Sequence, residues 1–552
     1  MTPFRPQSLL PTHEVTNQPE PLTDYNLFDS DLAFAETVKR LGDADTVRRV
    51  RAYGAALGRD EILAAGDLAN RETPELVAFD RFGRRLDEVR FHPSYHRLMS
   101  LGMEHGQHSI AWTAEAHGHL SHCALEYLMH QVEAGVCCPL SMTYAGLPAL
   151  KANPALYETW APKLLSRTYD PAFRPVADKA GATMGMAMTE KQGGSDVRAN
   201  ATRATHVKGE TYELVGHKWF CSAPMSDAFL TLAYTDAGLT CFFVPRWTAA
   251  RERNRLFIQR LKDKLGNKAN ASSEIEYHGA EAIRVGAEGR GIQTIIQMVH
   301  HTRVDTTVGA ASLMRAALVQ ALHFTAQRSA FQKRLIDQPL MQAVLADLAL
   351  ETEAAMLLAF RIAQAFDAAA AGNAQEKAFS RIGVAIAKYW LNKRVVGVVH
   401  EAMEAHGGSG FVEDGPMARL YREAPLNGIW EGAGNVICLD VLRALDKDAE
   451  AKDALVEQLK AACGHDRRLD AQVDRVIALA SNRAALEVNA RRLVEETALV
   501  LQADLMMRHA PAALADAFLA SRLDEANWGH AFGTLPPGLD LRAIVERAQP
   551  VL

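Results

Sequence analysis

Three separated segments carry glycine, hydroxyl and charged residues in an order that could hold a ligand. TEKQGGSD (189–196) follows a short apolar run, and GHKWFCSAP (216–224) sets a lysine and two aromatic residues before a serine. HGGSGF (406–411) precedes RLYREAPLNGIWEGAGN (419–435). Adjacent glycines let the backbone approach a phosphate or a flat cofactor where a side chain would clash. Each segment alone is also typical of a turn, so the segments have to be interpreted together.

Glu431, in the third segment, is a candidate base. It follows Ile429 and Trp430, and an apolar setting disfavours a charged carboxylate, so we expect the pKa of Glu431 to be raised. A raised pKa makes a carboxylate a better base toward a weakly acidic C–H bond. The alternative is a glutamate before Gly432 that only ends a helix or strand.

Histidines and one cysteine offer a metal-binding pattern in HGHLSHC (117–123). His119, His122 and Cys123 fall at i, i+3 and i+4, which places them on one face of a helix. No fourth ligand is evident, so we predict structural histidines and no metal site. The two histidines at 300–301 are predicted to pack or to lie at an interface.

The elements that must position these residues change in type along the chain. From about Asp31 to Lys163, apolar residues recur every three or four positions, which predicts helices. Short β-branched and aromatic runs follow as far as about Ile283, and those on either side of KGE (208–210) and DAG (236–238) predict strands joined by turns. Helical patterns return from Gly291 and are clearest over 339–366, where Leu340, Val344 and Leu348 fall at i, i+4 and i+8. This order predicts a mainly α protein with an inserted β domain. A Rossmann fold is disfavoured, because HGGSGF follows a helix instead of a strand.

Length and pattern together predict four regions. A chain of 552 residues is long enough for several packed units. We expect an N-terminal leader and α-helical domain (1–182), a β domain (183–290), a C-terminal α-helical bundle (291–445) and an additional helical extension (446–552).

Composition and charge narrow the class of protein. Hydrophobic residues at 48% and charged residues at 23% are typical of a globular protein. The net charge of −6 gives no general attraction for nucleic acid or an anionic membrane. No apolar run reaches the roughly 18 residues that a membrane span needs, so we expect a cytoplasmic protein without membrane contact. The seven cysteines, odd in number and without a CxxC pair, are expected to be reduced and buried.

Together these segments resemble the acyl-CoA dehydrogenase family, and RSAFQKRLIDQPLMQAVLADL (328–348) is similar to a further motif of that family. MTEKQGGSDV, RLKDKLGNKANASSEIEYHGA and RLYREAPLN most resemble its AidB-like branch, which is associated with the bacterial adaptive response to alkylating agents. The resemblance implies an α domain, a β-barrel-like domain and an α bundle, plus a helical C-terminal extension. It also implies bound FAD.

The resemblance assigns roles to particular residues. Thr189 and Ser195 would hydrogen-bond the flavin edge and pyrophosphate, and Phe220 would lie flat against the ring where the family usually has tryptophan. Ser222 would reach the polar edge of the ring. Arg328 would reach the flavin pyrophosphate of a neighbouring subunit. The residues implied to bind FAD are Met186, Met188, Thr189, Gly194, Ser195, Phe220, Cys221, Ser222, Arg328, Phe331, Gly408, Ile429, Trp430, Gly432 and Asn435.

The implied reaction is α,β-dehydrogenation of an acyl-CoA. In this family a glutamate removes the α proton of the acyl thioester, the β hydrogen passes to flavin N5 as hydride, and Glu431 stands at that position here. Gln332, Glu404, Ala433 and Asn435 replace the family's glycine, glutamine, threonine and glutamine or glutamate. Flavin contacts are therefore fewer than in the family, and weak activity is one expectation.

The resemblance implies a homotetramer that binds an acyl-CoA or a related small molecule. A rival function is an AidB-type protein that binds double-stranded DNA and protects it from alkylation damage, with a largely structural FAD. The extension carries more acidic than basic residues, and aspartates are interleaved with Arg468, Arg475 and Arg483. A DNA role would therefore need basic surface gathered from several chains.

Overall fold

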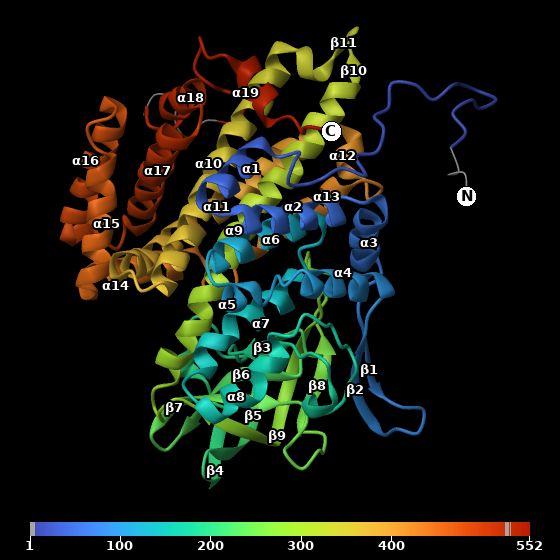
Figure 1. Cartoon of the computed structure of the whole chain (residues 1–552), viewed down its shortest axis with the longest axis vertical. Coiled ribbons are helices and arrows are strands. Elements are labelled where there is room, and N and C mark those ends of the chain that lie inside the picture. The colour runs from blue at the N-terminus through green and yellow to red at the C-terminus, as the bar shows by residue number, and fades with distance from the viewer. Residues whose placement is uncertain (1–5, 525–528, 530) are drawn as a thin grey trace.

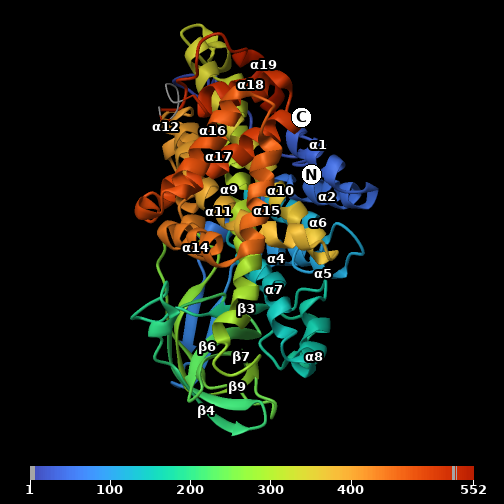
Figure 2. The same cartoon turned by 90° about the vertical axis from the view of Figure 1, so that its left-hand side faces the viewer.

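The computed structural model describes residues 6–524, 529 and 531–552. Figure 1 shows a helical part above and the β domain below, with the extension along one side. Three long helices, α9 (Gly291–Gln327), α10 (Pro339–Ala370) and α11 (Ala374–Glu404), run through the helical part, and a quarter turn shows them side by side (Figures 1 and 2). The predicted fold class, a mainly α protein with an inserted β domain, is confirmed.

The three long helices are buried over most of their length because they are apolar on nearly all sides. One continuous core joins them to the N-terminal helices and to the extension. Of the apolar series that predicted α10, Leu348 is buried and Val344 is partly buried, but Leu340 in the first turn is 85% exposed.

Helices build most of the N-terminal part, as predicted. A hairpin of β1 (Glu75–Phe79) and β2 (Arg85–Arg90) interrupts them and was not predicted. Arg85 donates to the Ile258 carbonyl and Asp87 accepts from the Ile258 N–H, so contacts with the β domain decide this segment. The helices are α1 (Leu32–Leu41), α2 (Ala44–Leu57), α3 (Asp60–Arg71), α4 (Pro93–Glu104), α5 (Ile110–Thr113), α6 (Gly118–Val132), α7 (Cys137–Leu150) and α8 (Pro154–Leu164).

The β domain is a sheet that closes on itself. Its strands are β3 (Met184–Ala187), β4 (Arg203–Lys208), β5 (Thr211–Ser222), β6 (Ala228–Thr235), β7 (Gly238–Pro245), β8 (Leu256–Leu261) and β9 (Ser272–Val285). The strands predicted on either side of KGE and DAG form the antiparallel pairs β4–β5 and β6–β7. The order β6–β4–β5–β9–β7 returns to β6, so the sheet is barrel-like. These strands therefore hydrogen-bond to neighbours on both sides and leave few unpaired edges.

Short elements lie between α9 and α10 and after α11, and those after α11 carry the third glycine-rich segment. They are the strands β10 (Ser329–Ala330) and β11 (Lys333–Arg334) and the helices α12 (Gly408–Phe411), α13 (Pro416–Glu423) and α14 (Gly434–Lys447). Short 3-10 turns lie at η1 (Val176–Asp178), η2 (Val197–Ala199), η3 (Leu335–Asp337), η4 (Leu426–Gly428) and η5 (Arg483–Ala485).

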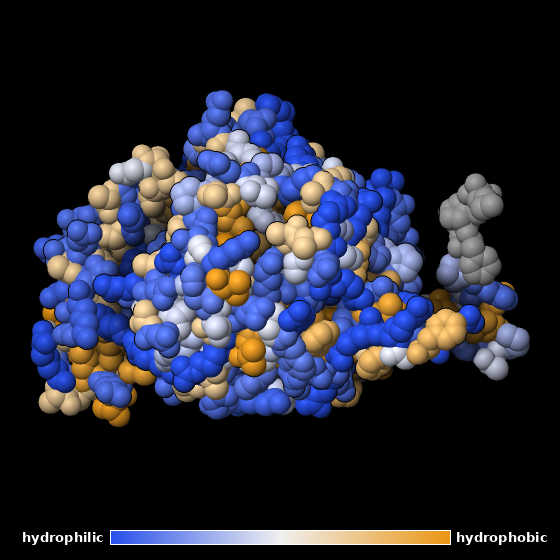
Figure 3. Space-filling model, turned by 90° about the horizontal axis from the view of Figure 1, so that it is seen from below, coloured by the Kyte–Doolittle hydropathy of each residue, from blue (hydrophilic) through white to orange (hydrophobic). Residues whose placement is uncertain are grey.

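The surface is mostly hydrophilic on the face seen in Figure 3, and most of the cysteines are buried as predicted. This face, at the β-domain end, carries separated hydrophobic spots. No helix in the described part of the chain is both long and apolar enough to cross a membrane. All seven cysteines are free and six are buried. Cys463 is exposed, against the prediction, because it follows the surface end of α15 (Ala449–Ala462).

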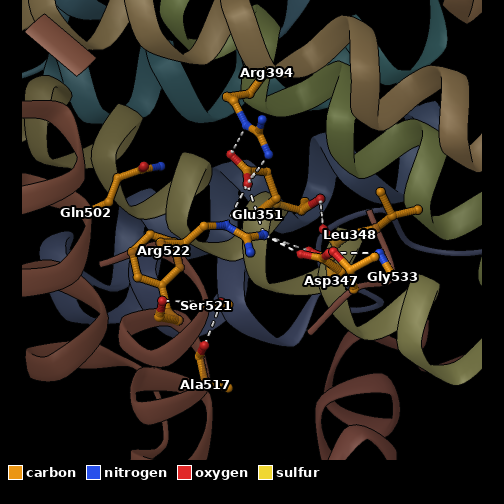
Figure 4. A network of polar contacts seen from close by, with 12 residues as sticks. Asp347, Leu348, Glu351, Arg394, Gln502, Ala517, Ser521, Arg522 and Gly533 are labelled. Atoms are coloured by element: carbon orange, nitrogen blue, oxygen red, sulfur yellow. Dashed lines mark hydrogen bonds and ion pairs between the residues drawn. The ribbon is translucent and has the colours of Figure 1, made fainter. Parts of the chain in front are cut away.

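Buried ion pairs attach the extension to the bundle. Besides α15, the extension contains α16 (Arg467–Ser481), α17 (Ala490–His509), α18 (Ala512–Arg522) and α19 (Leu541–Ala548). Arg522 at the end of α18 reaches Asp347 and Glu351 of α10, and Arg394 of α11 contacts Glu351 at 2.9 Å (Figure 4). Burial alone would raise the pKa of Glu351, but Arg394 and Arg522 outweigh it, so the pKa is lowered. The extension is thus part of the same core.

Arg522→Met should destabilise the protein by about 3–5 kcal/mol, because Asp347 then keeps a buried charge without its cation. Urea unfolding followed by circular dichroism measures the change. Arg542→Met is the matched control, because its pair with Glu546 is exposed and should contribute less than about 1 kcal/mol. Equal unfolding midpoints for the two variants would contradict the role of the buried pair.

Candidate functional site

A buried ion pair joins the first two sequence motifs. Lys218 Nζ on β5 lies 2.8 Å from Glu190 Oε1 and also donates to the Leu232 carbonyl at 2.8 Å. Both charged side chains have no exposed surface. Burial opposes ionisation of Glu190, yet Lys218 and hydrogen bonds from Ala201 and Thr202 lower the pKa of Glu190 to about 2. Burial lowers the pKa of Lys218 to about 8. The pair fixes the 189–196 loop against β5.

The 189–196 loop, called the cradle below, follows β3, and its residues 194–196 are exposed. The Trp219 N–H donates to the Thr189 carbonyl at 2.8 Å, which holds the loop beside β5. A Cβ on Gly194 would lie only 2.9 Å from the Thr189 side chain, so a larger residue here would require that side chain to move. Gly194 and Ser195 are both exposed, and their backbone is open to a ligand.

A bulge in β5 turns two predicted cofactor residues outward. The pairing of β5 with β9 shifts between Lys218 and Cys221. Phe220 is 46% exposed, and Ser222 lies with its Oγ 3.3 Å from Ser272 Oγ. Cys221 faces the core of the β domain and has no exposed surface, so only its backbone could meet a cofactor.

The turn that carries Glu431 meets the β domain. Met186, Met188 and Trp430 all pack against one cluster of buried side chains from the β domain, α7 and α9. Ile429 is 64% exposed, and the Trp430 indole N–H donates to Asn427 Oδ1 at 2.7 Å. The segment that leads into the first motif and the turn of the third motif therefore pack against the same cluster, at the junction of bundle and β domain.

Glu431 has a left-handed backbone with φ of 57°, which is unfavourable for a residue with a side chain. Two buried cations hold this turn. Arg303 Nε donates to the Glu431 carbonyl at 3.1 Å, and Lys388 Nζ donates to the Gly432 carbonyl at 2.9 Å. Arg303 is itself paired with Asp440 at 2.7 Å. Burial, and next the charge of Arg303, lower the pKa of Lys388 to about 7.

The Glu431 carboxylate points toward α9. Its Oε2 lies 2.9 Å from the Thr302 hydroxyl, while Oε1 has no hydrogen-bond partner among the described residues. Burial raises the pKa of Glu431, and the Thr302 hydrogen bond and the charges of Lys388 and Arg303 oppose the rise only in part. The arrangement presents a carboxylate whose free oxygen can accept a proton.

Three predicted cofactor residues lie elsewhere. Arg328 and Phe331 belong to the β10–β11 hairpin, which lies at the opposite end of the molecule from the β domain (Figure 1). Phe331 is 95% exposed with φ of 53°. Gly408 begins α12, and a Cβ there would meet nothing within 4 Å. Within one chain these residues cannot join the set around Thr189.

Asn435 is engaged by the extension. It is exposed, and its Oδ1 accepts a hydrogen bond from Arg491 Nε of α17 at 2.8 Å. Gly432 has φ of 111°, and a Cβ there would lie 2.8 Å from Ile437. The extension therefore touches the segment that follows the candidate base.

His119 and His122 of HGHLSHC each contact other protein side chains. His122 Nε2 lies 2.8 Å from Asp305 Oδ1, and His119 Nδ1 lies 2.8 Å from the Tyr144 hydroxyl. Cys123 is buried in the main core. These contacts favour the structural interpretation. His300 stacks on Phe366, which agrees with the predicted packing role of the pair at 300–301.

Sequence reasoning did not identify Thr302, Arg303 or Lys388 as site residues. Each lies on a long helix, far along the chain from Glu431. The sequence signal that could have pointed to such a residue is a charged side chain within an apolar helical run, as for Lys388 in AIAKYW.

Models of known protein families match three consecutive parts of the chain. The adaptive response protein AidB N-terminal domain matches residues 17–171, the acyl-CoA dehydrogenase middle domain matches 185–280, and its C-terminal domain matches 289–445. The Escherichia coli K12 protein named "Putative acyl-CoA dehydrogenase AidB" is 43% identical over 93% of this chain and 95% of its own length. Acyl-CoA dehydrogenase family member 11 of Caenorhabditis elegans is 31% identical over 76% of this chain and 71% of its own. The crystal structure of Caenorhabditis elegans ACDH-11 in complex with C11-CoA superposes with a TM-score of 0.83, at 25% identity over 99% of this chain and 98% of that one.

Lys218→Met should destabilise the β domain by about 3–5 kcal/mol, because Glu190 keeps a buried charge without its cation. The double variant Lys218→Met with Glu190→Gln should recover much of that loss. Unfolding midpoints measure the stability, and trypsin cleavage at the exposed Lys191 and Arg198 reports loosening of the loop. Arg84→Met, which breaks a pair on an exposed arginine, is the control. A double variant as unstable as the single one would contradict the account.

Proposed function

Because the chain belongs to the acyl-CoA dehydrogenase family and carries the AidB N-terminal domain, we propose that it is an FAD-dependent oxidoreductase that dehydrogenates an acyl thioester between its α and β carbons. The observation that carries this proposal is the Glu431 carboxylate. It has a raised pKa, is fixed by Thr302 through one oxygen, and stands on a turn held by two buried cations. The C11-CoA in complex with ACDH-11 supports an acyl-CoA as the class of substrate.

The residues around Thr189 fit a flavin. Gly194 and Ser195 offer an open backbone for the pyrophosphate, and the exposed Phe220 offers a flat apolar face for the ring. Bound FAD would supply the acceptor for the hydride that leaves the β carbon.

Glu431 would remove the α proton of the acyl thioester. Because Thr302 occupies Oε2, the free Oε1 is the atom that takes the proton. Burial makes the carboxylate a stronger base than an exposed glutamate, and the left-handed turn keeps it in one place.

A second copy of the chain would complete the flavin site. Arg328, Phe331 and Gly408 lie away from the β domain of their own chain, and Phe331 is almost fully exposed. We infer that they bind the pyrophosphate and adenosine end of FAD in a neighbouring subunit, within a homotetramer.

The rival DNA-binding function has less support from the extension. Arg468 pairs with Asp466 and Asp516, Arg475 lies 3.7 Å from Glu496, and Arg483 lies 3.9 Å from Asp446. These acids reduce the positive field of the three arginines within one chain. A salt-sensitive gel shift with double-stranded DNA, without any flavin reduction by acyl-CoAs, would favour the rival.

Anaerobic mixing of the FAD-loaded protein with a panel of acyl-CoAs should bleach the flavin absorbance. Glu431→Gln should slow the bleaching by about 100-fold or more, because the amide keeps the shape but cannot accept the proton. Glu487→Gln on the exposed surface of the extension is the control and should bleach at the wild-type rate. Bleaching that survives unchanged in Glu431→Gln would exclude Glu431 as the base.

Thr302→Val should shift the pH dependence of flavin reduction. The base must be ionised, so the rate falls as the pH drops through the pKa of Glu431. The Thr302 hydrogen bond lowers that pKa, and its loss should therefore move the acid limb of the profile to higher pH. Thr302→Ser keeps the hydroxyl and should retain the wild-type profile. Superimposable profiles for wild type and Thr302→Val would contradict the assignment.

A further inference from the structure

The N-terminal leader is hydrogen-bonded to the segment that carries Arg328. Asn17 Nδ2 donates to the Ser329 carbonyl at 2.9 Å, and the Ser329 N–H donates to Asn17 Oδ1 at 2.7 Å. Arg328 Nη1 donates to the Asn17 carbonyl at 2.6 Å. The Glu20 N–H donates to Gln327 Oε1 at 3.0 Å. The leader thus adds a partner to the short hairpin.

The backbone conformation and the side-chain amide of Asn17 both suit this contact. Its φ of 58° is left-handed, a conformation that asparagine tolerates better than most residues. Its side-chain amide pairs with both the N–H and the carbonyl of Ser329, as a neighbouring strand would. The backbone carbonyl remains free to accept from Arg328. Among the described residues, this is the one hydrogen bond to protein that the Arg328 guanidinium makes.

The hairpin needs outside support. It has two paired positions, Ser329 with Arg334 and Ala330 with Lys333. Both residues of its tip, Phe331 and Gln332, are left-handed without being glycine, at φ of 53° and 62°. A hairpin this short with a strained tip is not stable by itself.

The leader near Asn17 has little packed beneath it. Residues 18–23, Tyr25 and Leu27 line a cavity of ≈ 600 Å³, together with residues of α3, α9, α12 and α13. The described residues before Asn17 extend away from the body, and Leu9 is 69% exposed (Figures 1 and 3). The hydrogen bonds at Asn17 and Glu20 therefore carry much of the attachment between leader and hairpin.

We propose that Asn17 is a positioning residue for the flavin site: it fixes the β10–β11 hairpin and aims Arg328 at the cofactor of the neighbouring subunit. This rests on the proposed function, in which Arg328 binds the flavin pyrophosphate. The leader then determines how long FAD stays bound, although it contributes no residue that touches the cofactor.

The test compares FAD release from the purified oligomers of wild type, Asn17→Gly and Asn17→Asp, followed by the rise of flavin fluorescence after dilution. Asn17→Gly keeps the left-handed backbone but loses both side-chain hydrogen bonds, so FAD should dissociate roughly 10-fold faster. Asn17→Asp keeps the acceptor for the Ser329 N–H but loses the donor to the Ser329 carbonyl and sets a carboxylate oxygen against it, so FAD should also dissociate faster than from wild type. Amide hydrogen exchange at Ser329 should be faster in Asn17→Gly.

Asp24→Gly is the matched control. Asp24 is another left-handed polar residue of the leader, with φ of 55°, but its side chain accepts from the Asp60 N–H at the start of α3. This variant should release FAD at the wild-type rate, and thermal unfolding checks that all variants fold. Equal release rates for wild type and Asn17→Gly would overturn the proposal while leaving the proposed function intact. A wild-type protein that neither retains nor takes up FAD would overturn both.

Discussion

The fixed position of Glu431 is the constraint on which the site depends. A glutamate with a left-handed backbone is strained, and the strain persists only where the surroundings hold it. Here Arg303 and Lys388 bind the carbonyls of residues 431 and 432 from two different long helices. The bundle therefore does more than bury apolar surface, because its few buried cations set the turn that presents the carboxylate.

Apolar packing joins the β domain to the turn that carries Glu431, and a buried ion pair holds the 189–196 loop against the β domain. Trp430, Met186 and Met188 pack against one cluster of buried side chains, and the Glu190–Lys218 pair fixes the loop beyond β3 against β5. Removing either partner of a wholly buried pair leaves an isolated charge, so the loop keeps one position relative to Phe220. Buried ion pairs also attach the extension to the bundle, where Arg522 contacts Asp347 and Glu351 (Figure 4).

The sequence predicted the fold class well because three long patterns each had a clear period. Helical spacing over 339–366 and the hairpins around KGE and DAG were confirmed. The hairpin β1–β2 was missed, since contacts with Ile258 decide it and no local pattern reports them. Thr302, Arg303 and Lys388, which contact Glu431 and Gly432, were also not predicted, because they lie on helices far along the chain from that turn.

The candidate site was partly predictable. The motifs marked Glu431 and the loop around Gly194 as candidates, because their glycines and flanking residues are contiguous in sequence. The burial of Cys221 was not predictable, because a bulge breaks the alternation of β5. The contact between Arg491 and Asn435 joins segments 56 residues apart and has no sequence signal.

We propose that one flavin site is built from two chains: the cradle at Gly194 with Glu431 from one, and Arg328 from its neighbour. Co-expressing Gly194→Trp chains with Arg328→Ala chains tests it most directly, with FAD content per oligomer as the measurement. Each variant alone should lose FAD. Hybrid oligomers should regain it, because one interface then pairs an intact cradle with an intact arginine. Hybrids that stay as empty as the single variants would contradict the account.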